Sequence, residues 1–224
     1  MIKLSKRLAD IASLVPIDSS VIDVGCDHAL LDIYLYEHNL VRKIIASDIN
    51  AGALDNAKEN ITKYKLTDYI ETRLGNGLDT LKDDDGIDTI VISGMGAHTI
   101  VGIMKNNLKK LKNINTIIVQ SNTKLFFLRS ELTKLNYKID EELILEDNQK
   151  VYTIIRFVKG HKYYSKKELY FGPILLEKKS ATFTKYHKQE LEKLNIFLHL
   201  IPKKKILERY KIKKEIKLYR GVIN

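Results

Sequence analysis

A short polar turn follows the first β-rich run of the chain and holds side chains suited to chemistry. The run Val21–Val24 leads into Gly25, and Cys26, Asp27 and His28 come next. A glycine lets a ligand approach the backbone closely, while a carboxylate and an imidazole supply charge and hydrogen bonds. A segment with helical spacing follows. The order strand, tight turn and helix is typical of the start of a nucleotide-binding unit.

The residues of this turn distinguish two classes of cofactor. A nicotinamide dinucleotide needs Gly-x-Gly-x-x-Gly, whose glycines seat the pyrophosphate at a helix N-terminus. Here the turn reads Gly25-Cys-Asp-His-Ala-Leu, and the carboxylate of Asp27 would repel a pyrophosphate. It suits the sulfonium and the α-amino group of S-adenosylmethionine (AdoMet), so the turn predicts AdoMet. The alternative is that Asp27 and His28 cap the following helix.

Further candidate groups follow other β-rich runs. In an open parallel sheet, ligands bind at the carboxyl ends of the strands. Asp48 ends the second run, where its carboxylate can accept both ribose hydroxyls. Ile49 would pack on the adenine face and Asn76 would hydrogen-bond its edge. The predicted cofactor-binding residues are Asp23, Gly25, Cys26, Asp27, Asp48, Ile49, Asn76, Gly77, Ser93, Gly94, Met95 and Gly96.

The elements that must position these residues alternate along the chain. An amphipathic helix over 3–15 ends at Pro16. Helical runs then separate β-rich runs, which predicts a doubly wound parallel sheet. Two further β-rich runs in 137–160 flank a tight polar turn with no helix between them, so they predict a terminal antiparallel hairpin. That hairpin indicates an α/β fold of the Rossmann-like class I methyltransferases. The five earlier β-rich runs cover 21–25, 43–49, 69–76, 88–95 and 116–122.

The C-terminal part of the chain has a different composition. From residue 159 to the end, 18 Lys and Arg face 6 Asp and Glu, whereas residues 1–158 hold 20 against 22. A basic appendage on a nearly neutral domain indicates a polyanionic partner, with nucleic acid favoured over an acidic membrane or protein. A helical run over 174–201 is interrupted by Pro202, and a second run follows Lys203–Lys205 and continues through Tyr219. Together they predict an antiparallel, coiled-coil-like hairpin. We therefore expect two domains, a catalytic one over 1–160 and a basic helical one over 161–224.

Composition also limits the location of the protein. No apolar run reaches about 18 residues, and the charged N-terminus does not resemble a secretory signal. Cys26 is the single cysteine, so no internal disulfide can form, and no Cys/His cluster has zinc spacing. These features favour the cytoplasm and predict neither a membrane partner nor a metal. The oligomeric state is left open, with a monomer as the default.

The turn after the fourth β-rich run limits the reaction. Enzymes that methylate exocyclic amines often carry Asn/Asp-Pro-Pro-Tyr/Phe there, and this chain has Ser93-Gly-Met-Gly. Methylation of a pyrimidine at carbon 5 needs a cysteine nucleophile, and Cys26 lies in the cofactor turn. A ring nitrogen already has a lone pair, so the enzyme must mainly orient it. The product ring is cationic, and a nearby carboxylate would stabilise it.

Seven stretches, in this order over about 155 residues, resemble one known family: LSKRLADIASLV (4–15), DVGCDHALLDIYL (23–35), ASDINAGALDNAKENI (46–61), RLGNGLDTL (73–81), ISGMGAHTIVGIM (92–104), VQSNTKLFFLR (119–129) and ILEDNQKVYTII (144–155). Together they are similar to the bacterial tRNA (adenine-22, N1)-methyltransferases. The resemblance implies AdoMet-dependent methylation of N1 of adenine 22 in tRNA, giving 1-methyladenosine, with the basic helices as the tRNA-binding part. The alternatives are a methyltransferase for another RNA and a noncatalytic RNA-binding protein with this fold.

The chain departs from the usual family pattern at several positions. The family usually has Ser at Cys26, Pro at Asp32 and Pro at Ser121, and often Asp at Asn76 and Gly at Ala97. The missing proline at Ser121 affects the loop expected under the target base.

Five residues are expected to act on the target base: Asp27, His28, Gln120, Asn122 and Tyr152. Asp27 would stabilise the cationic product or accept a proton, and His28 would position it. Gln120 and Asn122 would read the adenine edge after the base is flipped out, and Tyr152 would stack on it. Asn122 is alternatively a helix cap, and Tyr152 a core residue.

Candidate tRNA contacts lie at both ends of the chain: Arg7, Lys166, Lys167, Lys203, Lys204 and Lys205. Arg7 is alternatively a solvated side chain. Five tyrosines interleave with the tail lysines and could stack on unpaired bases, namely Tyr163, Tyr164, Tyr186, Tyr210 and Tyr219. For Phe183 and Tyr210 we instead expect burial between the helices.

Overall fold

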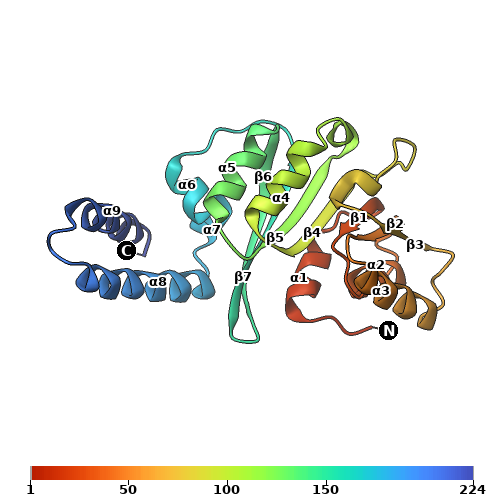
Figure 1. The fold of residues 1–224 in the computed structure, drawn as a ribbon, viewed down its shortest axis with the longest axis horizontal. Coiled ribbons are helices and arrows are strands. Elements are labelled where there is room, and N and C mark those ends of the chain that lie inside the picture. The colour runs from red at the N-terminus through yellow and green to blue at the C-terminus, as the bar shows by residue number, and fades with distance from the viewer. Residues whose placement is uncertain (1, 224) are drawn as a thin grey trace. The chain divides into compact units, whose positions relative to one another are not determined.

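Seven strands form one sheet in the order β3-β2-β1-β4-β5-β7-β6 (Figure 1). The computed structural model describes residues 2–223. Strands β1 to β5 pair in parallel, whereas β7 runs antiparallel to both β5 and β6. The strands are β1 (Ser19–Val24), β2 (Val41–Asp48), β3 (Ile70–Leu74), β4 (Thr89–Met95), β5 (Thr116–Ser121), β6 (Tyr137–Asp147) and β7 (Lys150–Lys159).

Helices cover this sheet in two layers. Helix α2 packs on both α1 and α3, and α4 packs on α5. From β1 the chain winds toward the β3 edge of the sheet, and from β4 it winds toward the other edge. Because each crossover is right-handed, these opposite directions place the two groups of helices on opposite faces of the sheet. The helices of this part are α1 (Lys6–Leu14), α2 (Leu30–Glu37), α3 (Ala51–Lys63), η1 (Gly77–Thr80), α4 (Ala97–Asn106), η2 (Lys110–Asn113) and α5 (Leu125–Lys134).

The strand order reverses between β1 and β4, which is where an open sheet of this class binds its ligand. Every residue of β1 and of β5 is buried, as expected for central strands covered by helices on both faces. The predicted doubly wound sheet with a terminal antiparallel hairpin is confirmed.

Capping side chains fix where several helices begin. The Ser5 hydroxyl accepts a hydrogen bond from the Leu8 backbone N–H at the start of α1, and Asn50 does the same for α3. Helix α1 ends at Leu14 because Pro16 keeps Val15 extended. These local signals set the helices that flank the turns after β1 and β2.

The side chain of Arg73 stabilises the turn after β3. The Arg73 Nη1 donates to the Thr80 carbonyl at 2.8 Å and to the Asp85 carboxylate at 2.5 Å. The guanidinium lowers the pKa of Asp85, so this carboxyl stays charged. The contact ties β3 to η1 and fixes the Asn76–Gly77 turn between them.

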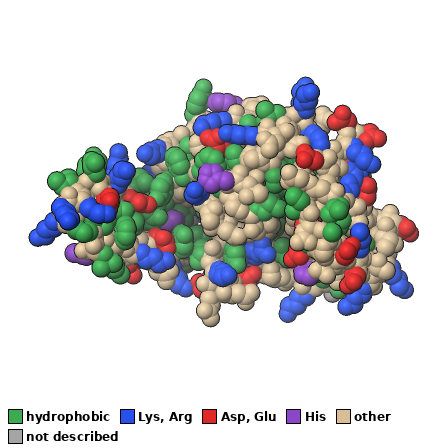
Figure 2. All heavy atoms as spheres, viewed as in Figure 1, with side chains coloured by type: hydrophobic (Ala, Val, Ile, Leu, Met, Phe, Trp, Pro, Cys, Tyr) green, Lys and Arg blue, Asp and Glu red, His purple; other side chains and the backbone are tan. Residues whose placement is uncertain are grey.

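A second compact unit begins at Tyr164. It contains α6 (Lys166–Phe171), α7 (Pro173–Lys178), α8 (Ala181–Leu200) and α9 (Ile206–Ile223), of which α8 and α9 form the predicted hairpin. Basic and hydrophobic side chains both lie on the surface of this hairpin (Figure 2). Helix α6 was not predicted. The continuous helix expected over 174–201 is wrong, because Lys179 adopts a left-handed conformation and Ser180 caps a new helix.

An aromatic cluster forms the core of this second unit. Phe171 and Phe183 are each 1 % exposed, and both rings contact His187. The Phe171 and His187 rings also contact Tyr219 of α9. The predicted burial of Phe183 is confirmed. The same prediction for Tyr210 is wrong, because its ring is 64 % exposed. Tyr219 is buried in the cluster, so it is not available to stack on a base.

No helix within residues 2–223 is both long enough and apolar enough to cross a membrane.

Candidate active site

Backbone hydrogen bonds fix the turn after β1. The backbone N–H groups of Gly25 and Cys26 both donate to the Ser47 carbonyl of β2, at 2.8 and 3.1 Å. Gly25 has a φ of +82°, and a Cβ there would lie 2.5 Å from the Met95 Cε. A side chain at Gly25 would therefore strain the turn and push on the end of β4. The turns after β1 and β4 are in contact, as a shared cofactor site requires.

The Asp48 carboxylate organises the turn after β2. Its Oδ1 accepts from the Asn50 N–H at 2.8 Å, and its Oδ2 accepts from the Asp27 N–H at 3.3 Å. The Gly75 N–H donates to the Asp48 carbonyl, which places the end of β3 beside it. Ile49 is 68 % exposed and Asn76 is exposed, so both can reach a ligand. Gly77 is buried beneath this surface against Ile103.

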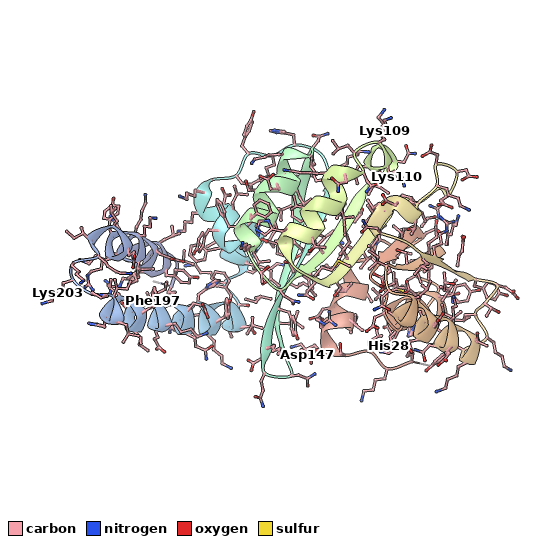
Figure 3. All side chains as sticks on the ribbon, in the orientation of Figure 1. His28, Lys109, Lys110, Asp147, Phe197 and Lys203 are labelled. Carbon is pink, nitrogen blue, oxygen red and sulfur yellow. The ribbon has the colours of Figure 1, made fainter. Side chains whose placement is uncertain are left out.

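Asp27 and His28 are both exposed in the turn between β1 and α2, and Figure 3 labels His28. The Asp27 Oδ2 and the His28 Nε2 lie 3.6 Å apart, with the side chains 66 % and 51 % exposed. Asp27 and Ala29 both have positive φ, and Ala29 occupies the N-cap position of α2 without a side-chain cap. The helix-capping interpretation of Asp27 and His28 is therefore wrong. Both side chains are available to a substrate.

A pair of buried carboxyls lies beneath this turn. Asp23, in β1, is 5 % exposed, and Asp32, in the first turn of α2, is 0 % exposed. Burial, with the charge of Asp48 adding to it, raises the pKa of Asp23 to about 7, and the neighbouring Asp32 carboxyl also acts on this pKa. Burial and the charge of Asp23 also raise the pKa of Asp32. The pair therefore shares a proton near neutral pH.

Two other groups face this carboxyl pair. Arg7 lowers the pKa of Asp23, although by less than burial and Asp48 raise it. Cys26 is buried beside the pair, and burial and the nearby carboxylates raise the pKa of its thiol. A thiol held protonated in this way is a poor nucleophile, which agrees with a packing role for Cys26.

The shared proton makes stability depend on pH. Unfolded carboxyls release their protons near pH 4, whereas folded Asp23 keeps its proton up to about pH 7 and the pKa of Asp32 is also raised. The free energy of unfolding should therefore fall as the pH rises through this window, by up to ~1.4 kcal/mol per pH unit. Asp32→Asn should flatten this slope and stabilise the fold at pH 8 by about 1–3 kcal/mol. Urea unfolding at pH 5 and pH 8 measures both effects.

The exposed Asp68→Asn is the matched control for this measurement, and it should leave the slope unchanged. Equal slopes for Asp32→Asn and the unchanged chain would contradict the shared proton.

A hydrogen-bond network joins the ends of β4 and β5. The Gln120 Oε1 accepts from the Gly94 N–H at 3.0 Å, and its Nε2 donates to the Asn122 Oδ1 at 2.9 Å. The Asn122 Nδ2 donates to the Gly94 carbonyl at 2.9 Å. Helix α5 has Lys124 as its N-cap residue, so the helix-cap interpretation of Asn122 is wrong. Both carboxamides are held in one orientation, with Gln120 buried and Asn122 exposed.

Arg7 of α1 lies at the centre of this network. Its Nη1 donates to the Ser93 Oγ at 2.6 Å and to the Gln120 Oε1 at 3.1 Å. Its guanidinium lies 5.5 Å from the centroid of the half-buried Tyr152 ring. Its backbone N–H donates to the carboxylate of Asp147, which Figure 3 marks at the end of β6. The sequence predicted that Arg7 contacts tRNA phosphate. It did not predict these contacts of Arg7 inside the site.

Two further residues at the site were missed. Lys124 and His98 meet at 2.9 Å between the Lys124 Nζ and the His98 Nε2, and the His98 ring packs on Phe127. Both are exposed, and each follows one of the predicted site turns by two residues. Their positions directly after Gly96 and Asn122 could have indicated them. Asp32 could have been identified as unusual because it stands where the family usually has a proline.

The predicted tRNA contacts of the second unit are exposed lysines. Lys166 and Lys167 begin α6, and the Lys167 Nζ donates to the Gly221 carbonyl. Lys203, Lys204 and Lys205 lie together in the turn between α8 and α9, and Lys205 pairs with Glu208 at 2.9 Å. The site residues named above fit a small cationic ligand at the ends of β1, β2 and β4. Residues 2–223 contain no group of three or more side chains placed to hold a metal ion.

Comparison with known proteins adds three findings. The family model described as tRNA (adenine(22)-N(1))-methyltransferase matches residues 21–221. The tRNA (adenine(22)-N(1))-methyltransferase of Bacillus subtilis strain 168 is 32 % identical over 197 residues, which cover 85 % of this chain and 82 % of that protein. A relative from M. capricolum, solved in complex with S-adenosyl-homocysteine, is 31 % identical with a TM-score of 0.90, and the match covers 98 % of this chain and 97 % of that one.

Proposed function

This chain belongs to the tRNA (adenine(22)-N(1))-methyltransferase family, and from that membership we propose how its own residues carry out the reaction. The enzyme transfers a methyl group from AdoMet to N1 of adenine 22 in tRNA, giving 1-methyladenosine. The observation that carries this function is a single family match, over 21–221, that spans both the strand-end turns and the basic helices.

The strand-end turns supply the cofactor site. AdoMet supplies, when bound, an electrophilic methyl group on a cationic sulfonium. Gly25 keeps the turn after β1 open, and the buried Asp23–Asp32 pair provides negative charge beneath it. The Asp48 carboxylate has the position to accept ribose hydroxyls, with Ile49 and Asn76 beside the adenine. Residues Ser93–Gly96 would line the end of AdoMet that carries the transferable methyl group. The acidic character of the turn supports this fit.

The target nitrogen needs orientation more than proton transfer. The adenine N1 uses its own lone pair to form the N–CH₃ bond, and the S–CH₃ electron pair stays on sulfur. No proton has to leave, because the product ring carries the positive charge. We therefore propose that Asp27 acts electrostatically on the cationic product and that His28 positions its carboxylate. The exposure of both side chains, 3.6 Å apart, supports this role.

The carboxamides are suited to holding the base without engaging N1. The described contacts of Asn122 use one Nδ2 hydrogen and one Oδ1 lone pair. Its second lone pair can accept from the adenine N6 amine, and its second hydrogen can donate to N7. Guanine would present a carbonyl where adenine presents the amine. We propose that Asn122 selects adenine, that Gln120 orients Asn122, and that Tyr152 stacks on a flipped base.

Arg7 provides a test of this arrangement. The Arg7 Nη1 donates to both Ser93 and Gln120, and the shorter lysine side chain ends before the position of this nitrogen. Arg7→Lys should lower kcat about 10- to 100-fold, as expected for losing charge-assisted hydrogen bonds of about 1.5–3 kcal/mol. AdoMet affinity should stay within about two-fold, because the proposed ribose and adenine contacts at Asp48, Ile49 and Asn76 do not involve Arg7. Single-turnover methylation and AdoMet titration measure the two quantities.

The neighbouring, exposed Lys6→Ala is the matched control for Arg7. A contact with phosphate alone would predict a different result. In that case Arg7→Lys would keep the charge and the activity, and Arg7→Ala would raise KM for tRNA with kcat unchanged.

We also propose a division of labour in which residues 1–160 bind AdoMet and residues 161–224 bind tRNA. The concentration of positive charge in the last third of the sequence supports it. A tRNA substrate and a single cysteine, which cannot form an internal disulfide, support a cytoplasmic location. A monomer remains the default proposal for the oligomeric state.

Purified protein incubated with labelled AdoMet and total tRNA tests the function. Nucleoside analysis should find the label in 1-methyladenosine. Label in another methylated nucleoside would move the reaction to a different target atom. Absence of label, with AdoMet still bound, would leave the fold and the cofactor but contradict the substrate.

A further inference from the structure

The tip of the α8–α9 hairpin carries an unusual concentration of exposed apolar side chains. Thirteen large hydrophobic residues within 2–223 are exposed, and six of them lie between 196 and 210. Their exposed fractions run from 51 % for Phe197 to 78 % for Leu207. Apolar groups gathered in this way mark an interaction surface. We define the hairpin tip as Ile196, Phe197, Leu200, Ile206, Leu207 and Tyr210.

The two helices contribute matching triads to the tip. Ile196, Phe197 and Leu200 follow the spacing i, i+1, i+4 at the end of α8. Ile206, Leu207 and Tyr210 repeat the same spacing at the start of α9. Residues at this spacing share one side of a helix, so each triad is a continuous apolar surface within a turn of the loop.

The loop between the triads is held in place. The Arg209 Nη1 donates to the Leu198 and Ile201 carbonyls at 2.7 and 2.6 Å, which satisfies the last turn of α8. Ile201 is buried, and the Lys205 N–H donates to the Pro202 carbonyl. The tip is therefore a fixed surface, presented about 30 Å along α8 from Ala181.

Charge selects the class of partner. Residues 196–214 hold seven Lys and Arg against the single acidic residue Glu208, and Lys203–Lys205 lie in the loop itself. A second copy of the chain would bring the same positive charge against this surface, which opposes self-association. A polyanion with an apolar face fits both features. RNA has this combination, because its phosphates flank the flat, apolar faces of its bases.

We propose that the hairpin tip packs its apolar triads on an exposed base face of folded tRNA while Lys203–Lys205 contact the flanking phosphates. This inference rests on the proposed function and names the kind of tRNA feature that the helical unit binds. Apolar side chains of this type pack against or between bases in other nucleic-acid complexes. The tip would supply a contact that depends on tRNA shape and not on salt.

Salt dependence separates the two parts of the contact. The apolar variant is Leu200→Ser, Ile206→Ser and Leu207→Ser, and the charge variant is Lys203→Gln, Lys204→Gln and Lys205→Gln. The control is Ile17→Ser, which alters a side chain that is 78 % exposed outside the helical unit. Each full-length protein is titrated with tRNA between about 50 and 200 mM salt, and AdoMet binding is measured in parallel.

The apolar variant should bind tRNA about 10-fold more weakly at every salt concentration, with an unchanged slope of log K against log salt. For the charge variant, the magnitude of the slope of log K against log salt should be smaller by about 2–3. The control should match the unchanged protein. AdoMet affinity should be the same in all four proteins, because the apolar and charge substitutions belong to the separate helical unit and Ile17 precedes β1.

Three results would overturn the inference. In the first, the apolar variant binds tRNA as the unchanged protein does. In the second, sedimentation finds a dimer that the apolar variant converts to a monomer with tRNA affinity unchanged. In the third, acidic phospholipid vesicles bind the unchanged protein but not the apolar variant, again with tRNA affinity unchanged. Failure of the proposed function is distinct, since the unchanged protein would then bind AdoMet without methylating tRNA.

Discussion

A chain that ends at Tyr163 should bind AdoMet within about two-fold of the full-length protein and lose tRNA methylation by about 10³-fold or more at physiological salt. The loss follows from phosphate contacts, because the removed residues carry the entire excess of positive charge. Neutralising several phosphates contributes a large part of the affinity of most proteins for nucleic acid. AdoMet binding should persist, because the strand-end turns and their hydrophobic core lie before Tyr163.

A full-length variant makes this test independent of truncation. Lys166, Lys167, Lys203, Lys204 and Lys205 are exposed, so changing all five to Gln should leave the fold intact. We expect a rise in KM for tRNA that becomes smaller at low salt, with AdoMet affinity unchanged. Loss of AdoMet affinity in a folded truncate would contradict the division of labour. So would full tRNA activity in the five-lysine variant.

Asp27→Asn should lower kcat about 10- to 100-fold with little change in AdoMet affinity. Asn keeps the shape of the side chain and removes its charge, which the account assigns to the cationic product ring. Mutations of groups that stabilise transition-state charge in closed sites cost about 2.7–4 kcal/mol, and the exposure of Asp27 reduces the effect expected here. The backbone N–H of Asp27 still donates to Asp48, so the turn should keep its form.

Single-turnover methylation at saturating AdoMet measures the chemical step for Asp27→Asn. His28→Gln should have a smaller effect, because its proposed role is to position the carboxylate. The exposed Asp84→Asn is the matched control and should retain full activity. An unchanged kcat for Asp27→Asn would remove Asp27 from the reaction. A loss of AdoMet affinity alone would place it in the cofactor site.

Local sequence signals predicted most of the sheet. Short apolar runs that end in Gly25, Asp48 and Gly94 mark strands and turns because buried parallel strands need continuous apolar residues. The polar turn between two β-rich runs predicted the terminal hairpin. The break at Lys179 escaped prediction because a left-handed lysine has no strong sequence signal.

Long-range contacts account for the parts of the site that sequence did not predict. Asp23 and Asp32 meet only because the residues between them include two non-glycine residues with positive φ. Arg7 reaches Gln120 across the fold. In the helical unit, periodicity identified apolar residues but not the side on which each packs. Tyr219 therefore proved buried and Tyr210 exposed.

The most direct test of the central claim uses two tRNA transcripts that differ only at position 22. One carries adenine there and the other guanine, and each is incubated with the full-length protein and labelled AdoMet. The account predicts 1-methyladenosine at position 22 of the first transcript and no methylation of the second. Equal methylation of both transcripts, or label at another position, would contradict it.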